Sequence, residues 1–354
     1  MSGHSAPPRE HFRYLDGNAV ATALDHVDVV SVVSEALRLH AESRVLLPEE
    51  AYLPWRSPSG AANRCLAMPG AVDFDTGFAV GLKTINASLG NVARGLARSQ
   101  GFTLLLDPET ARPTVLLEAA RISALRTAAV TAVAATTLGN SRRASLGLIG
   151  CGTLAMTHLT LLSETLPTLT EVRVHDIDRS RAEAFHERAR QACPALDIRI
   201  ADSAQECVEG MDLVVPVTTV TEGYIPYRWL SPGTLVSHVS LDDLLPDVIH
   251  RADLLVIDDW ELVSGDSRRL LGRMYRAGEL LEPSAVTGDG VHDVGRRRVD
   301  ATLGEIVSGT HQGRISDADI VVCNAFGMAI LDIAVAHRVA EASAKLQLGR
   351  VLEL

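Results

Sequence analysis

The segment from Ser145 to Ala155 constrains the fold of this chain more than any other. It reads Ser-Leu-Gly-Leu-Ile-Gly-Cys-Gly-Thr-Leu-Ala, an apolar strand followed by a turn of small residues, and a helix is expected over residues 157–166. Gly150 would permit a tight turn, Gly152 would let the backbone approach a pyrophosphate, and Ala155 would let the helix pack on the strand. The helix N-terminus would offer free N–H groups to the phosphates. The pattern predicts a dinucleotide-binding turn.

An acidic residue, Asp176, ends the next apolar strand at the spacing expected of a ribose-binding carboxylate. A carboxylate there would accept a hydrogen bond from the ribose 2′-hydroxyl and would repel a 2′-phosphate, so we expect NAD rather than NADP. The alternative is an ordinary strand, turn and helix whose small residues serve packing alone. The acid and the order of the surrounding elements favour the nucleotide site.

The remainder of the C-terminal half alternates between helical and strand patterns. A polar-faced helix is expected over residues 178–192, a strand over 196–200, and a short helix after the capping pattern Ser203 to Glu206. Apolar runs suited to buried parallel strands follow at residues 213–217, 234–239, 254–257 and 320–322. The fold class is therefore α/β, with a Rossmann-type doubly wound parallel sheet in an NAD-binding domain of residues 129–324.

The N-terminal half has a different pattern, which predicts an α+β substrate-binding and dimerisation domain made of residues 14–128 and 325–354. An alanine-rich helix should lie buried between the domains or in a subunit interface, and a last helix should return to this first domain. Residues 1–13 are expected to be a disordered tail, and the glycine- and arginine-rich segment 288–298 a mobile loop of unassigned role. The mostly antiparallel strands are expected at 64–68, 77–85, 102–107 and 113–118, and the two helices at 121–138 and 328–347.

Composition restricts the function classes. The chain has 354 residues, 47% hydrophobic content and a net charge of −11, without a basic block, which argues against nucleic-acid and anionic-membrane partners. No apolar stretch is long enough to span a bilayer, and the N-terminus does not resemble a signal peptide. Five cysteines without a C-x-x-C pair favour reduced thiols and a cytoplasmic location, and no metal-ligand spacing occurs, so no metal is assigned.

Charged residues inside apolar segments are the candidates for substrate chemistry. Arg64 and Arg126 each need an anion to offset desolvation, which could be a carboxylate of an amino-acid substrate or a protein acid such as Glu118. Lys83 lies in an apolar strand, where it could also be an edge residue whose ammonium reaches solvent. Asp242 follows the strand at 234–240, at the sheet edge where doubly wound folds bind ligands. Its neighbour, Asp243, is a rival acid or a helix cap.

Several of these segments together resemble the ornithine cyclodeaminase/mu-crystallin family, from Tyr14 onward. The resemblance implies that Arg64 and Arg126 bind the substrate carboxylate, that Lys83 and Asp242 are catalytic, and that Thr127 and Thr218 bind the cofactor. It also implies a homodimer. The segments that carry it are Asn63–Pro69, Gly81–Lys83, Leu125–Ala129, the Gly-Cys-Gly loop and Phe326–Ala329.

Residues 91–98, 106–110 and 257–260 resemble one branch of that family, which makes L-2,3-diaminopropionate for siderophores or antibiotics. Its members use NAD to oxidise the secondary amine of N-(2-amino-2-carboxyethyl)-L-glutamate and hydrolyse the imine to 2,3-diaminopropionate and 2-oxoglutarate. A partner synthase of the cysteine-synthase type supplies the substrate from O-phosphoserine and glutamate. Arg94 and Arg98 are candidates to bind the additional carboxylates, or else solvated surface residues.

Three other functions stay open within the resemblance. The first is an ornithine or lysine cyclodeaminase that recycles NAD internally. Residues 240–245, Ser-Leu-Asp-Asp-Leu-Leu, lack the glycine pair and Cys-Pro-Gly of those enzymes, which counts against it. The second is a ketimine reductase or simple amino-acid dehydrogenase. The third is a crystallin-like protein that binds NAD without turnover, although such a protein would not need to keep both the arginines and the acid.

Overall fold

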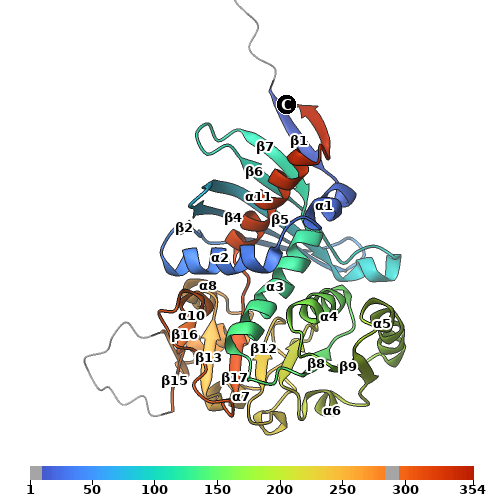
Figure 1. The fold of residues 1–354 in the computed structure, drawn as a ribbon, viewed down its shortest axis with the longest axis vertical. Helices are drawn as coiled ribbons and strands as arrows, with labels where there is room; N and C mark the ends of the chain where they lie inside the picture. The colour runs from blue at the N-terminus through green and yellow to red at the C-terminus, as the bar shows by residue number, and fades with distance from the viewer. Residues whose placement is uncertain (1–9, 284–294) are drawn as a thin grey trace, which may run out of the picture. The chain divides into compact units, whose positions relative to one another are not determined.

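The computed structural model of the protein describes residues 10–283 and 295–354 and is shown in Figure 1. The chain divides into two compact units. Unit 1 comprises Met1–Val32, Ser43–Arg126 and Ala329–Leu354, and unit 2 comprises Val33–Glu42 and Thr127–Met328. Two of the divisions, after Val32 and after Arg126, fall inside the helices α2 (Val29–Ala41) and α3 (Ala120–Leu138), so each of these helices belongs partly to both units.

Unit 2 is built on a parallel sheet, which confirms the predicted α/β Rossmann-type fold. The order of its described strands is β10-β9-β8-β11-β12-β17-β13-β16, and every neighbouring pair is parallel. Their bounds are β8 (Ser145–Ile149), β9 (Glu171–His175), β10 (Asp197–Ile200), β11 (Leu213–Pro216), β12 (Leu235–Ser237), β13 (Leu254–Ile257), β16 (Ala301–Thr302) and β17 (Val321–Asn324). Strands β8, β11, β13 and β17 are buried throughout, which explains their continuous apolar runs.

Helices connect these strands. In Figure 1, α4 and α5 lie on one side of β8 and β9 and α6 lies on the other, as the doubly wound arrangement requires. The helices of unit 2 are α4 (Thr153–Thr165), α5 (Arg179–Ala192), α6 (Ala204–Val208), α7 (Pro246–Arg251), α8 (Trp260–Gly265), α9 (Leu270–Arg276) and α10 (Leu303–Ser308), with a 3₁₀ turn η2 (Tyr227–Trp229). A separate strand pair joins β14 (Leu280–Leu281) to β15 (Arg297–Arg298). Of the loop expected at 288–298, residues 288–294 lie outside the described residues.

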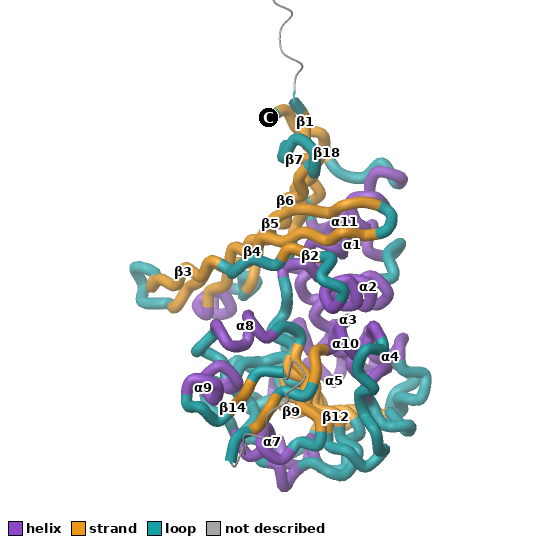
Figure 2. The backbone as a smooth tube through the Cα atoms, turned by 90° about the vertical axis from the view of Figure 1, so that its left-hand side faces the viewer, coloured by secondary structure: helices purple, strands orange, loops and turns teal. Residues whose placement is uncertain are grey.

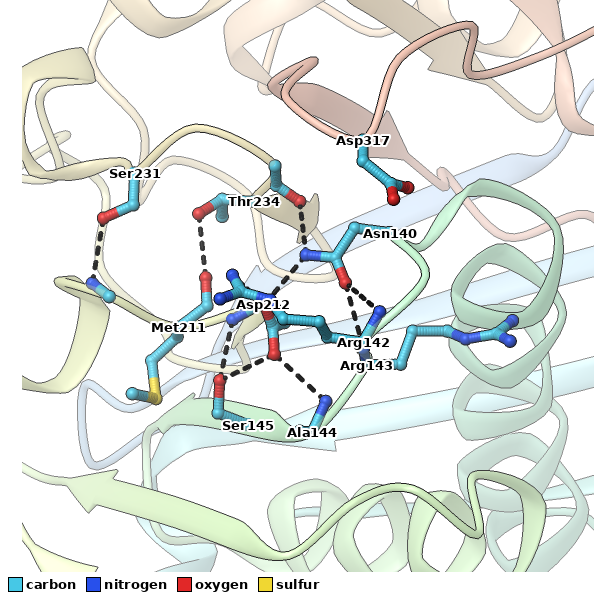
Figure 3. A network of polar contacts seen from close by, with 12 residues as sticks. Asn140, Arg142, Arg143, Ala144, Ser145, Met211, Asp212, Ser231, Thr234 and Asp317 are labelled. Carbon is cyan, nitrogen blue, oxygen red and sulfur yellow. Dashed lines mark hydrogen bonds and ion pairs between the residues drawn. The ribbon is translucent and has the colours of Figure 1, made fainter.

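A buried polar network fixes the N-terminal ends of β8 and β11 (Figure 3). The carboxylate of Asp212, just before β11, accepts hydrogen bonds from Asn140 Nδ2 at 2.8 Å, the Ala144 amide at 3.0 Å and Ser145 Oγ at 3.1 Å. Arg142 adds an ion pair at 2.8 Å. Burial acts to raise the pKa of Asp212, but these donors outweigh it, and the pKa lies below 3.8.

We expect Asp212→Asn to lower the free energy of unfolding by about 2–3 kcal/mol, because the new amide group would face N–H donors that lose their acceptor. A carboxylate whose folded-state pKa is depressed stabilises the fold above its unfolded pKa and loses that effect as the pH falls through the folded pKa. The difference from wild type should therefore be full at neutral pH and shrink below pH 3.8. Urea unfolding measures it, with the exposed Asp197→Asn as a control near zero.

Unit 1 contains a mostly antiparallel sheet, as the sequence predicted. The order of its described strands is β18-β1-β7-β6-β5-β4-β2, with β3 paired to β4; only β1 and β7 are parallel. Figure 2 shows β3, β4, β5 and β6 side by side. The strands are β1 (His11–Leu15), β2 (Val45–Leu46), β3 (Ala51–Arg56), β4 (Ala62–Phe74), β5 (Gly77–Ser88), β6 (Ser99–Leu106), β7 (Pro113–Glu118) and β18 (Arg350–Glu353).

One face of this sheet is covered by α11 (Ala329–Lys345), the red helix that crosses β4, β5 and β6 in Figure 1. Two glycines permit the close approach. A Cβ on Gly70 would lie 3.3 Å from Ile330 Cγ2, and one on Gly81 would lie 3.1 Å from Ile333 Cδ1. Unit 1 also contains α1 (Gly17–Leu24) and the 3₁₀ turn η1 (Leu89–Arg94). The close packing brings the polar groups of α11 directly onto the sheet.

Three expectations about unit 1 need correction. The tail was expected to extend to residue 13, but β1 begins at His11, because residues 11–14 pair with β18; residues 1–9 lie outside the described residues. No strand was expected within residues 47–62, a Pro-containing segment, but it contains β3, whose Pro54 lies on an edge strand that tolerates a missing N–H. The strand β18 was not predicted, because its residues are all exposed and show no alternation.

Helix α3 is buried along most of its length within the single chain, as its alanine-rich composition predicted. Among the described residues, no helix is both long enough and apolar enough to cross a membrane.

Candidate functional site

The glycine-rich turn of unit 2 has the geometry that a dinucleotide requires. Gly150 has φ +94°, and a Cβ there would lie 3.0 Å from the Val217 carbonyl oxygen, so both its conformation and its neighbours demand glycine. Gly152 is the N-cap of α4, and a Cβ there would meet nothing within 4 Å. No side chain caps this helix, so its first N–H groups are available to a phosphate.

Helix α4 begins at Thr153, four residues earlier than the predicted start. The sequence argument placed the start at the apolar run from residue 157. The helix in fact begins directly after the turn, because Gly152 takes the extended N-cap conformation and the following residues are compatible with helix. Ala155 is fully buried in the first turn of α4.

Asp176 follows β9 and lies beside the glycine turn. Its carboxylate accepts hydrogen bonds from the Cys151 amide at 2.9 Å and the Asp178 amide at 3.0 Å. A carboxylate has about four lone-pair sites, so acceptor capacity is left for a hydroxyl group. Burial and the charge of Asp176 raise the pKa of the Cys151 thiol to about 12, so the turn itself carries no thiolate at neutral pH.

Strands β8 and β11 lie at the point where the strand order reverses, and ligands of doubly wound folds bind at the C-terminal edge there. Gly150 follows β8 and Thr218 follows β11. The two positions are close, since a Cβ on Gly150 would lie 3.4 Å from Thr218 Cα. The Thr218 hydroxyl donates to Asp243 Oδ1 at 2.6 Å, which fixes its orientation.

Asp243 is fully buried and surrounded by donors. Tyr224 donates its phenol to Asp243 Oδ1 at 2.9 Å, and Ser240 donates its hydroxyl to Asp243 Oδ2. Burial and the Asp243 charge raise the pKa of Tyr224, which keeps the phenol protonated as a donor. Asp243 is not a helix cap, because α7 begins at Pro246 with Leu245 as its N-cap. Asp243 therefore holds the loop around Thr218.

Asp242 has a different environment. Its side chain is 4% exposed and accepts a hydrogen bond from Arg273 Nη2, on α9, at 2.5 Å. Arg273 itself is 45% exposed, so the pair lies at the edge of the buried region. Sequence reasoning did not anticipate this partner, because the arginine lies in a segment with several exposed arginines and no distinguishing pattern.

A buried charge cluster lies in unit 1. Lys83 Nζ, on β5, is 2.8 Å from Asp332 Oδ2, on α11, and Arg126 Nε, on α3, is 3.0 Å from the same oxygen. Lys83 is 1% exposed, so it does not extend to solvent as an edge residue would. Glu118 is not the partner of Arg126, because its carboxylate accepts the Ala120 amide at 2.6 Å and caps α3.

Two further arginines of unit 1 lie close together. Arg64, on β4, and Arg98, just before β6, are both half-buried, and burial together with the Arg64 charge lowers the pKa of Arg98. Within residues 10–283 and 295–354, neither guanidinium pairs with a carboxylate, and Arg98 Nε is buried without a hydrogen-bond partner. Arg94 is exposed and donates to Ser59 Oγ at 3.1 Å.

The predicted site residues are divided between the two units. Unit 1 contains Arg64, Lys83, Arg94, Arg98 and Arg126, and unit 2 contains Thr127, Gly150, Gly152, Ala155, Asp176, Thr218 and Asp242. Thr127 is half-buried in α3. The described part of the chain shows no group of three or more His, Cys, Asp or Glu side chains placed to hold a metal ion.

Sequence reasoning missed Asp332, although a signal was present. Asp332 is the only charged residue in the apolar stretch Met328–Ala336, as Arg126 is in its own segment. A buried charge needs a partner, so the two could have been matched. Glu118, which the sequence argument named as a possible partner, is much nearer to Arg126 along the chain.

The fold and these sites define an α/β protein with a Rossmann-type unit bearing a glycine-rich turn and a second unit bearing buried cations. The chain belongs to the ornithine cyclodeaminase/mu-crystallin family, whose model matches residues 15–346. It is 30% identical to the N-((2S)-2-amino-2-carboxyethyl)-L-glutamate dehydrogenase of Staphylococcus aureus, over 92% of this chain and 93% of that protein.

Two solved structures resemble the whole chain. The crystal structure of CmnK is 38% identical, with a TM-score of 0.88, and the match covers 98% of this chain and 99% of that one. The structure of an archaeal alanine dehydrogenase dimer with bound NAD is 25% identical, with a TM-score of 0.81, and covers 97% of this chain and 99% of that one.

Proposed function

We propose that the protein is an NAD-dependent dehydrogenase that converts N-(2-amino-2-carboxyethyl)-L-glutamate, NAD⁺ and water into L-2,3-diaminopropionate, 2-oxoglutarate, NADH and a proton. Oxidation of the secondary amine gives an imine, and water then cleaves the C–N bond. The product would serve siderophore or antibiotic biosynthesis. The similarity to the dehydrogenase of Staphylococcus aureus supports this reaction over the other activities of the family.

The observation that carries the proposal is the excess of cations in unit 1. Lys83 and Arg126 share one acid, while Arg64 and Arg98 lie near each other without a carboxylate among the described residues. Two guanidinium groups at close range repel each other unless an anion lies between them. The proposed substrate carries three carboxylates, whereas ornithine and alanine carry one. The cations therefore favour a polycarboxylate amino acid.

NAD fits the turn of unit 2. Gly150, Gly152 and the uncapped start of α4 would hold the pyrophosphate, and Asp176 would hold the ribose hydroxyl groups. Thr127 and Thr218 are further candidates for contacts with the cofactor. When bound, NAD⁺ supplies a hydride acceptor, and the nicotinamide cofactor of the archaeal alanine dehydrogenase structure supports this choice.

The protein's own residues would bind the substrate and move protons. Arg64 and Arg126 would hold a carboxylate through paired hydrogen bonds and so fix the carbon that loses hydride. Lys83 would lie against that carboxylate or the reacting nitrogen. Asp242 would accept the proton of the substrate amine, or hold the water that attacks the imine.

Asp176 offers a direct test of the cofactor assignment. Asp176→Ser is expected to raise the ratio of kcat/KM for NADP to that for NAD by about 10–100-fold, because the repulsion of a 2′-phosphate is removed. Steady-state kinetics with both cofactors measures the ratio. The exposed Asp197→Asn should leave it unchanged, and an unaltered ratio in the Asp176 variant would show that this acid does not contact the ribose.

The reaction itself is tested by incubating the protein and NAD with N-(2-amino-2-carboxyethyl)-L-glutamate, and in parallel with L-ornithine, L-lysine, L-alanine or a cyclic ketimine with NADH. Absorbance follows NADH, and mass spectrometry identifies products. NADH together with 2-oxoglutarate and 2,3-diaminopropionate would support the proposal. Proline or pipecolate without net NADH would indicate a cyclodeaminase, ketimine reduction a reductase, and binding of NAD without any turnover a crystallin-like protein.

We also propose that the protein acts in the cytoplasm as a homodimer. The apolar side chains of β3 support self-association: Leu53 is 63% exposed and Trp55 is 45% exposed on a strand with no buried residue. The archaeal alanine dehydrogenase was solved as a dimer. Measuring the molar mass of the protein in solution tests whether it is a homodimer. A synthase of the cysteine-synthase type would be the pathway partner that supplies the substrate.

A further inference from the structure

Among the described residues, the carboxylate of Asp332 contacts both Lys83 and Arg126, two buried cations of unit 1. Its side chain is fully buried, and a single oxygen, Oδ2, lies 2.8 Å from Lys83 Nζ and 3.0 Å from Arg126 Nε. Three different elements, β5, α3 and α11, bring these groups together. Removing one member of such a cluster would leave an uncompensated buried charge and so destabilise the fold.

Two polar atoms in or beside this cluster accept or donate no hydrogen bond within the described part of the chain. Asp332 Oδ1 and Thr103 Oγ1 are both buried and have no hydrogen-bond partner among the described residues. Thr103 is directly paired with Lys83 across strands β5 and β6, so the two side chains share one face of the sheet. Buried polar atoms without partners are rare in folded proteins. Their presence beside two cations that share one carboxylate indicates a site that a ligand or water completes.

We propose that Asp332 is a positioning residue of the substrate site, which holds the Lys83 ammonium and the Arg126 guanidinium side by side and leaves them a net positive charge for a substrate carboxylate. Lys83, Arg126 and Asp332 together carry a single positive charge, which matches one carboxylate of the substrate; Glu50 acts on Lys83 more weakly. This inference rests on the proposed function for the identity of the ligand. The geometry of the cluster does not depend on it.

The charges around Lys83 determine the direction of each test. Burial lowers the pKa of Lys83 to about 8, the Asp332 carboxylate acts to raise it, Arg126 acts to lower it, and Glu50 adds a smaller upward effect. Removing the acid should therefore lower the Lys83 pKa further, whereas removing the guanidinium should raise it. These opposite shifts test the arrangement of charges in the cluster, and the kinetic measurements test its role in substrate binding.

The sequence makes this measurement simple, because Lys83 and Lys345 are the only two lysines. Labelling the protein with [ε-¹³C]lysine gives two NMR signals, and Lys345→Arg identifies the Lys83 signal. In Asp332→Asn we expect the Lys83 pKa to fall by about 1–2 units, and in Arg126→Gln to rise by about one unit. The exposed Asp73→Asn, also in unit 1, should shift neither.

Activity gives a second readout. In wild type, kcat/KM for the proposed substrate should fall above the Lys83 pKa of about 8, because the neutral amine no longer attracts a carboxylate. In Asp332→Asn this fall should begin at lower pH, and KM should rise about tenfold or more. In Asp332→Glu, which keeps the carboxylate, kcat/KM should decline at the same pH as in wild type. If Asp332→Asn does not fold, the shift in Arg126→Gln still decides the matter.

A Lys83 pKa that is unchanged in both variants would overturn the inference. Failure of the proposed function gives a different result, namely no NADH from wild type with N-(2-amino-2-carboxyethyl)-L-glutamate. The NMR titration needs no substrate, so the two failures are distinguishable.

Discussion

Replacing Asp242 with asparagine is expected to lower kcat for the proposed substrate by about 10²–10⁴-fold, the usual contribution of a general acid–base group. The amide cannot accept the proton of the substrate amine or activate water, yet it keeps the size of the carboxylate. Since Asp242 is 4% exposed and its known partner is the half-exposed Arg273, the substitution should not disrupt the core. Stopped-flow absorbance of NADH, with substrate saturating, measures the effect.

The matched control is Asp197→Asn, an exposed aspartate of the same unit that pairs with Arg199. It should retain wild-type kcat, and both variants should bind NAD with unchanged affinity by fluorescence titration. If Asp242→Asn kept more than about a third of wild-type kcat, the proton would have to be transferred by another group or by solvent, and the assignment of Asp242 would be wrong.

The second large effect is expected at Arg98. Arg98→Ala should raise KM for N-(2-amino-2-carboxyethyl)-L-glutamate by about 10–100-fold with a smaller change in kcat, because a charge-assisted contact to a carboxylate contributes about 1.5–3 kcal/mol. Its half-buried position and the unpartnered Nε indicate a group that awaits an anion. Arg94→Ala should change KM by about threefold at most, because that guanidinium is exposed.

Arg112→Ala provides the control, since this arginine of unit 1 is 45% exposed and pairs with Glu10. It should leave KM unchanged. Protection of the protein against thermal unfolding by 2-oxoglutarate gives an independent readout, and it should be lost in Arg98→Ala. A KM equal to that of Arg112→Ala would mean that Arg98 does not contact the substrate, and would weaken the case for a polycarboxylate ligand.

Much of unit 2 could be predicted from sequence, because its signals are local. Two closely spaced glycines, Gly150 and Gly152, and an acid after the next strand indicate a turn whose geometry depends on a few neighbouring residues. The apolar runs of β11 and β13 have the length and burial of parallel strands. The order of the strands, with β17 between β12 and β13, was beyond such reasoning, since it depends on contacts between distant segments.

The charged sites show where sequence reasoning reaches its limit. Arg126 was recognised as a buried cation, but its acid lies 206 residues later on α11, and no local pattern connects them. Arg273 was missed because an exposed arginine on a short helix carries no signal until its partner, Asp242, is placed beside it. Which polar residues pair is determined by the tertiary fold, whereas turns and hydrophobic periodicity are determined by the local sequence.

The assembly of unit 1 from distant segments has a consequence for folding during synthesis. The sheet strands β1 to β7 precede residue 119, yet the helix α11 that covers β4, β5 and β6 begins at Ala329, after all of unit 2. Domains generally fold as units while the chain emerges, and contacts over long sequence separations form slowly. Unit 2 can therefore complete its core first. The ion pairs of Lys83 and Arg126 with Asp332 can form only after α11 has been synthesised. A released chain truncated after Met328 should hold a protease-resistant unit 2 and an open, protease-sensitive unit 1.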